Sequence, residues 1–444
     1  MKKILIILLF SIQLSATVYA QPSKHVILVS IDGFRPDFYL DKTWPTPNIQ
    51  NLAQEGVTCL GVVGVMPTST YPSHTSIITG TNPIKHGIYY NTDFSVANGN
   101  GEWHTSYYDI KVESLWQAAK RNGLTTASIS WPVSVGAPID YNIPEIWSKT
   151  NSLERRTASS EYATPKGLFE ELLENATGKL SMEDYNLTSL SFDDNLSRMA
   201  AYLIRTYKPN LLTIHLPCVD GAQHKEGLNG KMVTRSIAGA DHAISTIIDA
   251  VEKAGIKENT TIFIIGDHGF VGTHTAIAPN IWLQQNGIVY GDPSTWSCRF
   301  ISAGGSCFFH LKNVNDKETL KKVKQMLLHL PASQQKLFKL LEKEEVIKLG
   351  GNSEAEFALA AIPGIMFNNN TNGELIRSSI GGTHGYTPDM AYINSGVVVS
   401  GAGVPKGAVV NSMNLNDLAP TIAYLLGFEF NNVDGMVVPA IIVK

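Results

Sequence analysis

Two apolar runs in this chain end in metal-binding side chains, and this feature constrains the fold more than any other. The first, VILVSIDG, leads to Asp32, and the second, TIFIIGDHG, leads to Asp267 and His268. Continuous apolar runs of this length are typical of strands buried on both faces of a parallel sheet. Open α/β sheets bind ligands at the carboxyl ends of such strands. The sequence therefore predicts an α/β fold with a doubly wound, mostly parallel sheet, helices on both faces and a functional site at that edge.

Two further segments add candidate metal ligands. The run LLTIHLPCVDGAQH reaches Asp220 and then His224, and the loop GGTHGY places His384 between glycines that permit close backbone approach. Aspartates and histidines in this mixture suit Zn²⁺ or another divalent first-row ion, and their number exceeds the ligands of a single tetrahedral zinc. We therefore expect a site for two metal ions. Each residue taken alone is better explained as a turn former, a helix cap or a hydrogen-bonded side chain.

A hydroxyl group lies at the predicted start of a helix in the segment VMPTSTYPSH. Thr70 stands just before Pro72, which is pre-set for a first helical turn, and a helix N-terminus offers backbone N–H groups to an anion. Because a hydroxyl is a poor nucleophile until a metal ion lowers its pKa, Thr70 becomes a candidate nucleophile only beside the metal ligands. The alternative is that Thr70 or Ser69 caps the helix.

The order and local spacing of these residues resemble the nucleotide pyrophosphatase/phosphodiesterase family of the alkaline phosphatase superfamily. The resemblance spans most of the chain and is carried by Asp32, Thr70 in TYPSH, Asn91 after HGIYY, Asp220-x-x-x-His224, Asp267-His268-Gly269 and His384. It implies an alkaline-phosphatase-like fold and two Zn²⁺ ions. One zinc would be held by Asp32, Asp267, His268 and the oxygen of Thr70, and the other by Asp220, His224 and His384.

The same resemblance implies a reaction. Thr70 would attack the phosphorus of a phosphodiester or pyrophosphate to give a phosphothreonine, and Asn91 would donate a hydrogen bond to a non-bridging phosphoryl oxygen. Tyr71 would stack on a nucleobase, and Tyr185 resembles the second ring of that clamp. The chain departs from the family pattern at Tyr71, Ser73 and Val133, where the family often has Phe, Asn and Gly. These departures bear on substrate preference more than on the metal site.

The choice between diesters and monoesters depends on the segment SISWPVSVGAP. Monoester-cleaving relatives with a threonine nucleophile carry a lysine and an arginine in the corresponding place, whereas this segment contains no cation and has Trp131-Pro132. A diester carries less negative charge, so the segment favours a phosphodiesterase acting on small nucleotide-like molecules. A phosphomonoesterase, a phosphonoacetate-type hydrolase and a non-catalytic binding protein on the same fold are the alternatives. A sulfatase would need a C-x-P-x-R motif, which the TYPSH segment lacks.

The N-terminus predicts export. Residues 1–20 combine two lysines, a short apolar stretch and small residues before Gln21, which is the layout of a signal peptide. We therefore expect a periplasmic or extracellular protein with no stable membrane anchor, a retained anchor being the alternative. Loss of Lys2 and Lys3 would change the formal net charge from −4 to −6, and no basic run is present, so no nucleic-acid polymer is expected as a partner.

We expect residues 21–444 to form one catalytic domain with an insertion at about 272–375. The predicted core alternates strands and helices, with helices after Thr46-Pro47, in VESLWQAAKRNG and in KMVTRSIAGADHAISTIIDAVEKAG. A helix-rich segment near 150–195 would wall the substrate site. Cys298 and Cys307 flank a Gly-Gly turn in a predicted hairpin, where a disulfide and two free thiols are equally compatible with the sequence.

Overall fold

The computed structural model describes residues 23–94, 101–187, 189–288 and 296–443, and its centre is a 9-stranded sheet. The predicted signal peptide at 1–20 lies outside the described residues. In the part of the chain that is described, no helix combines the length and the apolar character needed to cross a membrane. The strands, in spatial order, are β17 (Ala408–Val410), β2 (Val57–Val63), β16 (Ser395–Gly401), β6 (Thr260–Ile265), β1 (His25–Ile31), β5 (Leu211–Leu216), β3 (Thr126–Ile129) and β4 (Tyr141–Ile143), while β18 (Met413–Asn414) pairs with β2.

The middle of this sheet is parallel and in register at the edge that carries the predicted ligands. Strand β1 pairs in parallel with β5 and with β6, so that Ile31 lies opposite Leu216 and Ser30 lies opposite Ile265. Strand β16 runs antiparallel to both of its neighbours. Because the central strands end side by side, the residues that follow them are brought together at one edge of the sheet.

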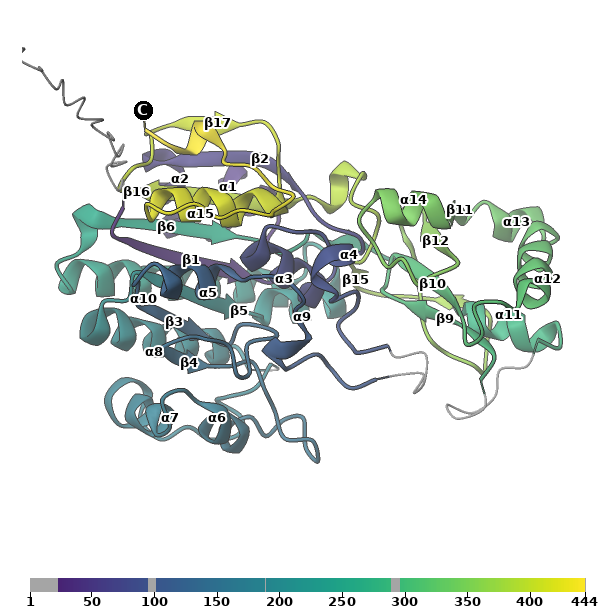
Figure 1. Cartoon of the computed structure of the whole chain (residues 1–444), viewed down its shortest axis with the longest axis horizontal. Coiled ribbons are helices and arrows are strands. Elements are labelled where there is room, and N and C mark those ends of the chain that lie inside the picture. Colours follow the sequence, from purple (N-terminus) through teal and green to yellow (C-terminus); the bar gives the residue numbers. More distant parts are fainter. Residues whose placement is uncertain (1–22, 95–100, 188, 289–295, 444) are drawn as a thin grey trace, which may run out of the picture.

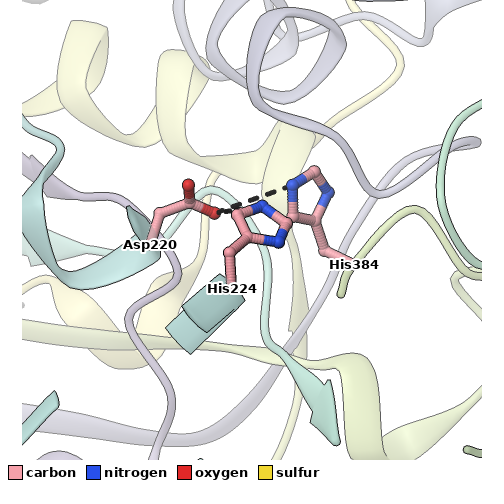
Figure 2. Close-up of side chains that lie close together, drawn as sticks. All are labelled: Asp220, His224 and His384. Carbon is pink, nitrogen blue, oxygen red and sulfur yellow. Dashed lines mark ion pairs between the residues drawn. The ribbon is translucent and has the colours of Figure 1, made fainter. Parts of the chain in front are cut away.

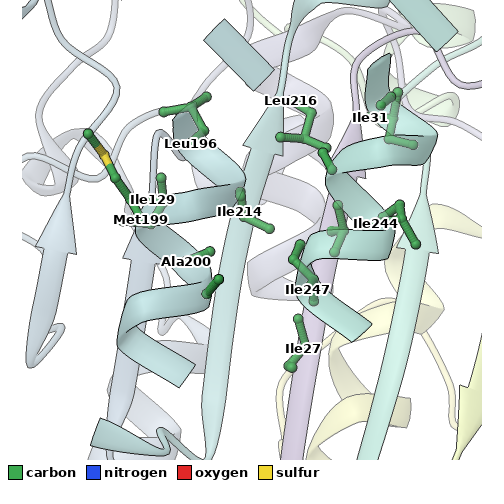
Figure 3. Packing of buried hydrophobic residues seen from close by; sticks show 14 of the residues in the cluster. Ile27, Ile31, Ile129, Leu196, Met199, Ala200, Ile214, Leu216, Ile244 and Ile247 are labelled. Carbon is green, nitrogen blue, oxygen red and sulfur yellow. The ribbon is translucent and has the colours of Figure 1, made fainter. Parts of the chain in front are cut away.

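Alternate side chains of the central strands enter two different hydrophobic cores. Ile27 and Ile31 of β1 face the core formed with α8 (Ser191–Tyr207) and α10 (Lys231–Lys253), as Figure 3 shows. Val26 and Leu28 face the opposite core, which is formed with α3 (Thr70–Thr79), α5 (Leu115–Arg121) and α15 (Leu418–Leu425). Burial of both faces explains the continuous apolar runs in the sequence. The predicted doubly wound α/β fold is confirmed.

The helices expected from the sequence occur with similar bounds. Pro47 opens α2 (Pro47–Glu55), which ends at Gly56, and α5 and α10 fall within the two predicted segments. The remaining helices near the site are α4 (Pro83–His86), α6 (Arg156–Tyr162), α7 (Leu168–Leu172) and α9 (Cys218–Glu226), with a π-helical turn at Leu173–Thr177.

The chain between β6 and β16 forms separate small sheets beside the main one, on the right of Figure 1. Strands β11 (Phe338–Glu342), β12 (Phe357–Ala361), β10 (Ser306–Leu311) and β9 (Cys298–Ser302) make a four-stranded sheet, accompanied by α11 (Pro279–Gln285), α12 (Lys317–Leu328), α13 (Ala332–Gln335) and α14 (Lys343–Lys348). These elements fall inside the range predicted as an insertion. The shorter pairings are β13 (Ile365–Phe367), β8 (Thr275–Ile277) and β14 (Ile376–Ser378), and β15 (Gly382–Thr383) with β7 (Val271–Gly272).

The cysteine pair lies on the predicted hairpin but forms no disulfide. Strands β9 and β10 are antiparallel neighbours, in which Cys298 is opposite Leu311 and Cys307 is opposite Ser302. The two thiols therefore occupy different rungs of the ladder, and all four cysteines of the chain are free and buried. Of the two alternatives left by the sequence, the structure has the free thiols.

Candidate metal centre and substrate cavity

The first predicted group of ligands meets at the ends of β1 and β6. The Nε2 atom of His268 lies 3.4 Å from Oδ1 of Asp32 and 3.1 Å from Oδ2 of Asp267. All three side chains are buried. The parallel register of the two strands accounts for this convergence, because Asp32 follows Ile31 directly and Asp267 follows Ile265 by two residues.

Thr70 points into this group from the first residue of α3. Its Oγ1 lies 3.3 Å from Nε2 of His268. Ser69 occupies the N-cap position of α3 but makes no capping hydrogen bond with its side chain. The hydroxyl of Thr70 is thus directed at the ligand group, and the capping role considered from the sequence is not observed for either residue.

The second predicted group comes from α9 and from the loop after β15. In Figure 2, Asp220, His224 and His384 face one another, and Oδ1 of Asp220 lies 3.3 Å from Nε2 of His224 and 3.6 Å from Nε2 of His384. Asp220 and His224 are four residues apart on α9, so they share one face of that helix. The ring of His384 also stacks on His268 at 3.8 Å between centroids, which brings the two groups into contact.

Hydrogen bonds to backbone carbonyls orient all three imidazoles. The Nδ1 atoms of His224, His268 and His384 lie 3.0 Å, 3.1 Å and 3.1 Å from the carbonyl oxygens of Gly382, Gly269 and Thr68. A carbonyl only accepts, so each Nδ1 carries the proton and each Nε2 presents a lone pair to the carboxylates. Imidazoles held in this way are typical of metal ligands.

The carboxylates of Asp32 and Asp267 are also oriented by the protein. In each of them, one oxygen has a polar partner and the other has no hydrogen bond. Oδ1 of Asp267 accepts the backbone N–H of Gly33 at 3.0 Å, and Oδ2 of Asp32 contacts Nε2 of His215 at 3.1 Å. The opposite oxygens, Oδ2 of Asp267 and Oδ1 of Asp32, are buried without a hydrogen-bond partner, as is Oδ1 of Asp220. Buried unpaired carboxylate oxygens facing neutral imidazole nitrogens are a donor set that fits divalent cations such as zinc.

The electrostatics of the centre also favour a bound cation. Burial, together with the charge of Asp220, raises the pKa of Asp32 to about 7, and burial raises the pKa of Asp267 well above its usual value. Burial lowers the pKa of His268 strongly and that of His384 to about 4. In the first group, carboxylates that resist ionisation lie beside an imidazole that resists protonation, so this group lacks positive charge, which a metal ion would supply. In the second group, the contact between Asp220 and His224 outweighs burial, lowers the pKa of Asp220 and raises the pKa of His224.

Asn91 lies at the other side of the nucleophile. Its Oδ1 accepts the backbone N–H of Tyr71 at 3.0 Å. The amide Nδ2 group is therefore the end of the side chain that is free to donate to a ligand. Asn91 and Thr70 both line the same cavity, in keeping with the role predicted for Asn91.

His215 and Glu145 form a buried polar chain behind Asp32 that the sequence did not suggest. Besides its contact with Asp32, His215 has Nδ1 at 3.2 Å from the carbonyl oxygen of Ser130 and at 3.5 Å from Oε2 of Glu145. Burial alone would lower the pKa of His215, but its contacts with Asp32 and Glu145 outweigh burial and raise the pKa. The raised pKa favours a ring that carries both protons and donates from Nε2 to Asp32.

A cavity of about 510 Å³ opens onto both ligand groups. Its wall away from the metal ligands contains aromatic and apolar side chains together with one buried ion pair: Tyr71, Trp103, Trp147, Leu153, Leu187, Glu145 and Arg155. Arg155 has its Nη1 4.0 Å from Glu145 and its guanidinium carbon 5.0 Å from the ring centroid of Trp147. The segment near 150–195 thus contributes to this wall, as expected from the sequence.

The structure places the two predicted stacking residues differently. Tyr71 lines the cavity, but it is only 1% exposed and packs against Trp103, a residue that is 45% exposed. Tyr185 is 2% exposed, is not among the residues lining the cavity, and packs in the core against Phe169 and Phe192. Tyr71 therefore borders the cavity, whereas Tyr185 lies outside its lining, which corrects the expectation for Tyr185.

Trp103 and Trp147 are the aromatic residues of the cavity that sequence reasoning missed. Neither lies in a regular helix or strand, so no periodic pattern marks either one. Their rings contact each other edge to face at 5.6 Å. The only available signal was their proximity in sequence to Asn91 and Trp131-Pro132.

Several known proteins are similar to this chain. A bovine protein named bis(5'-adenosyl)-triphosphatase is 25% identical over 434 residues, which is 96% of this chain and 84% of the bovine protein. Rat ectonucleotide pyrophosphatase/phosphodiesterase family member 3 is 26% identical over 257 residues, which is 55% of this chain and only 24% of that relative. The structure of human ectonucleotide pyrophosphatase/phosphodiesterase 5 matches with a TM-score of 0.68 at 20% identity, covering 93% of this chain and 97% of the human one.

The structural match supports the alkaline-phosphatase-like fold expected from the sequence. The sequence profile described as type I phosphodiesterase / nucleotide pyrophosphatase matches residues 26–387, and this range contains all of the predicted metal ligands. The chain therefore belongs to the type I phosphodiesterase / nucleotide pyrophosphatase family.

Proposed function

We propose that this protein hydrolyses phosphodiester or pyrophosphate bonds in small nucleotide-like molecules, with Thr70 as the nucleophile. One observation carries the proposal: Oγ1 of Thr70 lies 3.3 Å from the Nε2 lone pair of His268, at the point where Asp32 and Asp267 also converge. Membership of the family supports the reaction class, and the name of the bovine relative is compatible with a nucleotide substrate.

Two zinc ions fit the donor set. Asp32, Asp267, His268 and the Thr70 oxygen would hold one of them, and Asp220, His224 and His384 would hold the other. When bound, such ions lower the pKa of a coordinated hydroxyl or water and neutralise negative charge on a phosphoryl group. The unpaired oxygens of the three aspartates and the orientation of the three imidazoles support this assignment.

The chain's own residues then account for the steps of the reaction. Thr70 Oγ1 releases its proton to solvent and attacks the phosphorus, the bond to the leaving oxygen breaks in line, the leaving group takes up a proton from solvent, and a phosphothreonine results. Asn91 Nδ2 donates a hydrogen bond to a non-bridging oxygen and holds the phosphoryl group in place. A water molecule then attacks the phosphothreonine from the side of Asp220 and His224, which releases the phosphorylated product and restores the hydroxyl.

The cavity also bears on the choice between diesters and monoesters. Arg155 is a cation on the cavity wall, which favours a phosphomonoesterase as the second candidate. However, Arg155 is buried and lies 4.0 Å from Glu145, so its charge is largely balanced within the protein. Arg155 therefore stabilises a dianionic monoester less than an unpaired guanidinium would. The diester remains the preferred substrate.

A rate comparison tests the proposed function. Purified protein should contain two zinc ions per chain, lose activity with a chelator, and show a higher kcat/KM for a nucleotide nitrophenyl diester than for nitrophenyl phosphate. Each missing charged contact in such a site costs about 3 kcal/mol, or roughly two orders of magnitude in rate. An equal or higher kcat/KM for the monoester would favour the phosphomonoesterase, and preferred cleavage of phosphonoacetate would favour the phosphonate hydrolase.

We also propose that the protein is exported from the cytoplasm. The signal-peptide layout of residues 1–20 supports export across the inner membrane, to the periplasm or the medium. Fractionation of cells that express the full chain tests this directly, because an exported protein should be recovered without residues 1–20.

A further inference from the structure

A second cavity of about 410 Å³ borders the candidate metal ligands His224 and His384. Four residues line both cavities: Asn91, Trp103, His224 and His384. A phosphoryl group held at Asn91 and the candidate metal ligands therefore adjoins two spaces. A diester has two substituents on its phosphorus, and each space is of a size to take one of them.

The elements between β6 and β16 build the outer wall of this second cavity. The turn of the β9–β10 hairpin, residues 303–305, packs on the loop that carries His384, where the N–H of Gly305 donates to the carbonyl of His384 at 2.8 Å. A side chain at Gly385 would collide with the carbonyl oxygen of Ala303, so glycine is required for this close approach. The hairpin is thus fixed against a metal-ligand loop.

The lining of the second cavity contains many uncharged polar groups. Seven of its side chains end in a hydroxyl or an amide: Ser69, Tyr90, Asn91, Thr92, Ser302, Asn369 and Thr383. Among the described residues that line it, none is a lysine, arginine, aspartate or glutamate. The aromatic cavity differs in this respect, because its wall contains the Glu145 and Arg155 pair.

Several of these polar groups are available to a ligand. Within the described part of the chain, the hydroxyls of Ser69, Thr92 and Thr383 make no hydrogen bond to the protein. Asn369 accepts the backbone N–H of Ser302 at 2.8 Å with its Oδ1, which leaves its Nδ2 group free to donate. Hydroxyl and amide groups can both donate to and accept from the alcohols of a neutral substituent.

We propose that this second cavity binds the other substituent of the diester and selects a neutral, hydroxyl-rich group such as glycerol, a sugar or a nucleoside over an anionic one. The inference rests on the proposed function, since it names the substrate class of the same site. Beyond the metal ion that His224 and His384 would hold at one end of the cavity, a pyrophosphate or carboxylate in this space would give up solvation without meeting a cationic side chain on the described walls. The chain is therefore a phosphodiesterase in preference to a pyrophosphatase.

Two matched diesters test the proposal. One is the glycerol ester of adenosine 5'-phosphate and the other is its glycerate ester. Both contain the same nucleotide, and they differ by a single negative charge on the second substituent. We expect the release of AMP from the glycerol ester to show at least a tenfold higher kcat/KM, and ATP to be the poorest of the three substrates. Equal or reversed values for the two esters would overturn this inference alone. If neither ester is cleaved while nitrophenyl phosphate is, the proposed function fails as well.

A charge introduced into the cavity provides a second measurement. Asn369→Lys should raise kcat/KM for the glycerate ester relative to the glycerol ester by about tenfold, whereas the matched control Asn369→Gln should leave that ratio near the wild-type value. The ratio is insensitive to a general loss of active protein, because both esters are measured on the same preparation. A ratio that does not change in Asn369→Lys would show that the second substituent lies elsewhere.

Discussion

His215 lies 3.1 Å from Oδ2 of Asp32 and leaves the other oxygen of that carboxylate directed at His268. The doubly protonated ring is held in turn by Glu145 and by the carbonyl of Ser130. This contact fixes the orientation of Asp32, and it balances part of the negative charge that the three aspartates concentrate at the centre.

His215→Phe should therefore weaken metal binding. Loss of an outer partner of a ligand lowers metal affinity by about 10- to 100-fold, and His215→Gln, which can still donate to Asp32, should lose less. Competition of the metal-free variants with a coloured zinc chelator measures the affinity without reference to turnover. An unchanged affinity in His215→Phe would mean that Asp32 needs no such support.

Thr70→Ala should abolish turnover and leave most of the metal in place, because only the attacking oxygen is removed from a set that retains Asp32, Asp267 and His268. Turnover above about a thousandth of the wild-type rate, equivalent to roughly 4 kcal/mol in the barrier, would indicate direct attack by water. Zinc content and thermal unfolding of the same preparation serve as controls for folding. Thr70→Ser should keep part of the activity.

Trp103→Ala should lower kcat/KM for nucleotide esters more than for a methyl nitrophenyl diester, which has no base. Stacking of one ring on one base contributes about 1–3 kcal/mol, so a decrease of roughly 5- to 150-fold is expected for the nucleotide ester. Tyr185→Phe is the matched control, because Tyr185 is buried and its hydroxyl contacts only Ser159, at 3.3 Å. An effect of Trp103→Ala on the nucleotide ester that is no larger than that of Tyr185→Phe would mean that Trp103 does not stack on the base.

The convergence of the candidate metal ligands could be predicted because each lies next to a strand or within a short motif whose geometry is local. The ends of β1 and β6 fix Asp32 and Asp267, and helical spacing fixes Asp220 relative to His224. The fold was predictable for a related reason, since burial of both sheet faces leaves long apolar runs in the sequence.

The cavity wall could not be predicted in the same way. Trp103 and Trp147 lie in irregular segments and meet only because their loops are folded over the sheet edge. Arg155 and Glu145 carry no pattern that separates a buried pair from exposed charges. Tyr185 was expected in the cavity wall but lies in the core. The resemblance that suggested this residue depends on a loop whose path the sequence does not determine.

The last prediction concerns the stability of the fold against pH. Asp193 on α8 is buried, and burial raises its pKa from 3.8 to about 6, although contacts with Cys218 oppose the shift. The folded chain therefore holds this proton more tightly than the unfolded chain does. The resulting stability is fully present below pH 4, declines between pH 4 and pH 6, and is lost above pH 6.

Asp193→Asn removes this dependence, because asparagine stays neutral at every pH. The free energy of unfolding of the variant, minus that of the wild type, should rise by about 2 kcal/mol between pH 4 and pH 8. Urea unfolding in the presence of a chelator measures this difference and keeps metal binding out of the comparison. Asp249→Asn, at an exposed position of α10, is the control and should show no such rise. A difference for Asp193→Asn that stays constant across this range would mean that the carboxyl of Asp193 titrates normally in the folded protein.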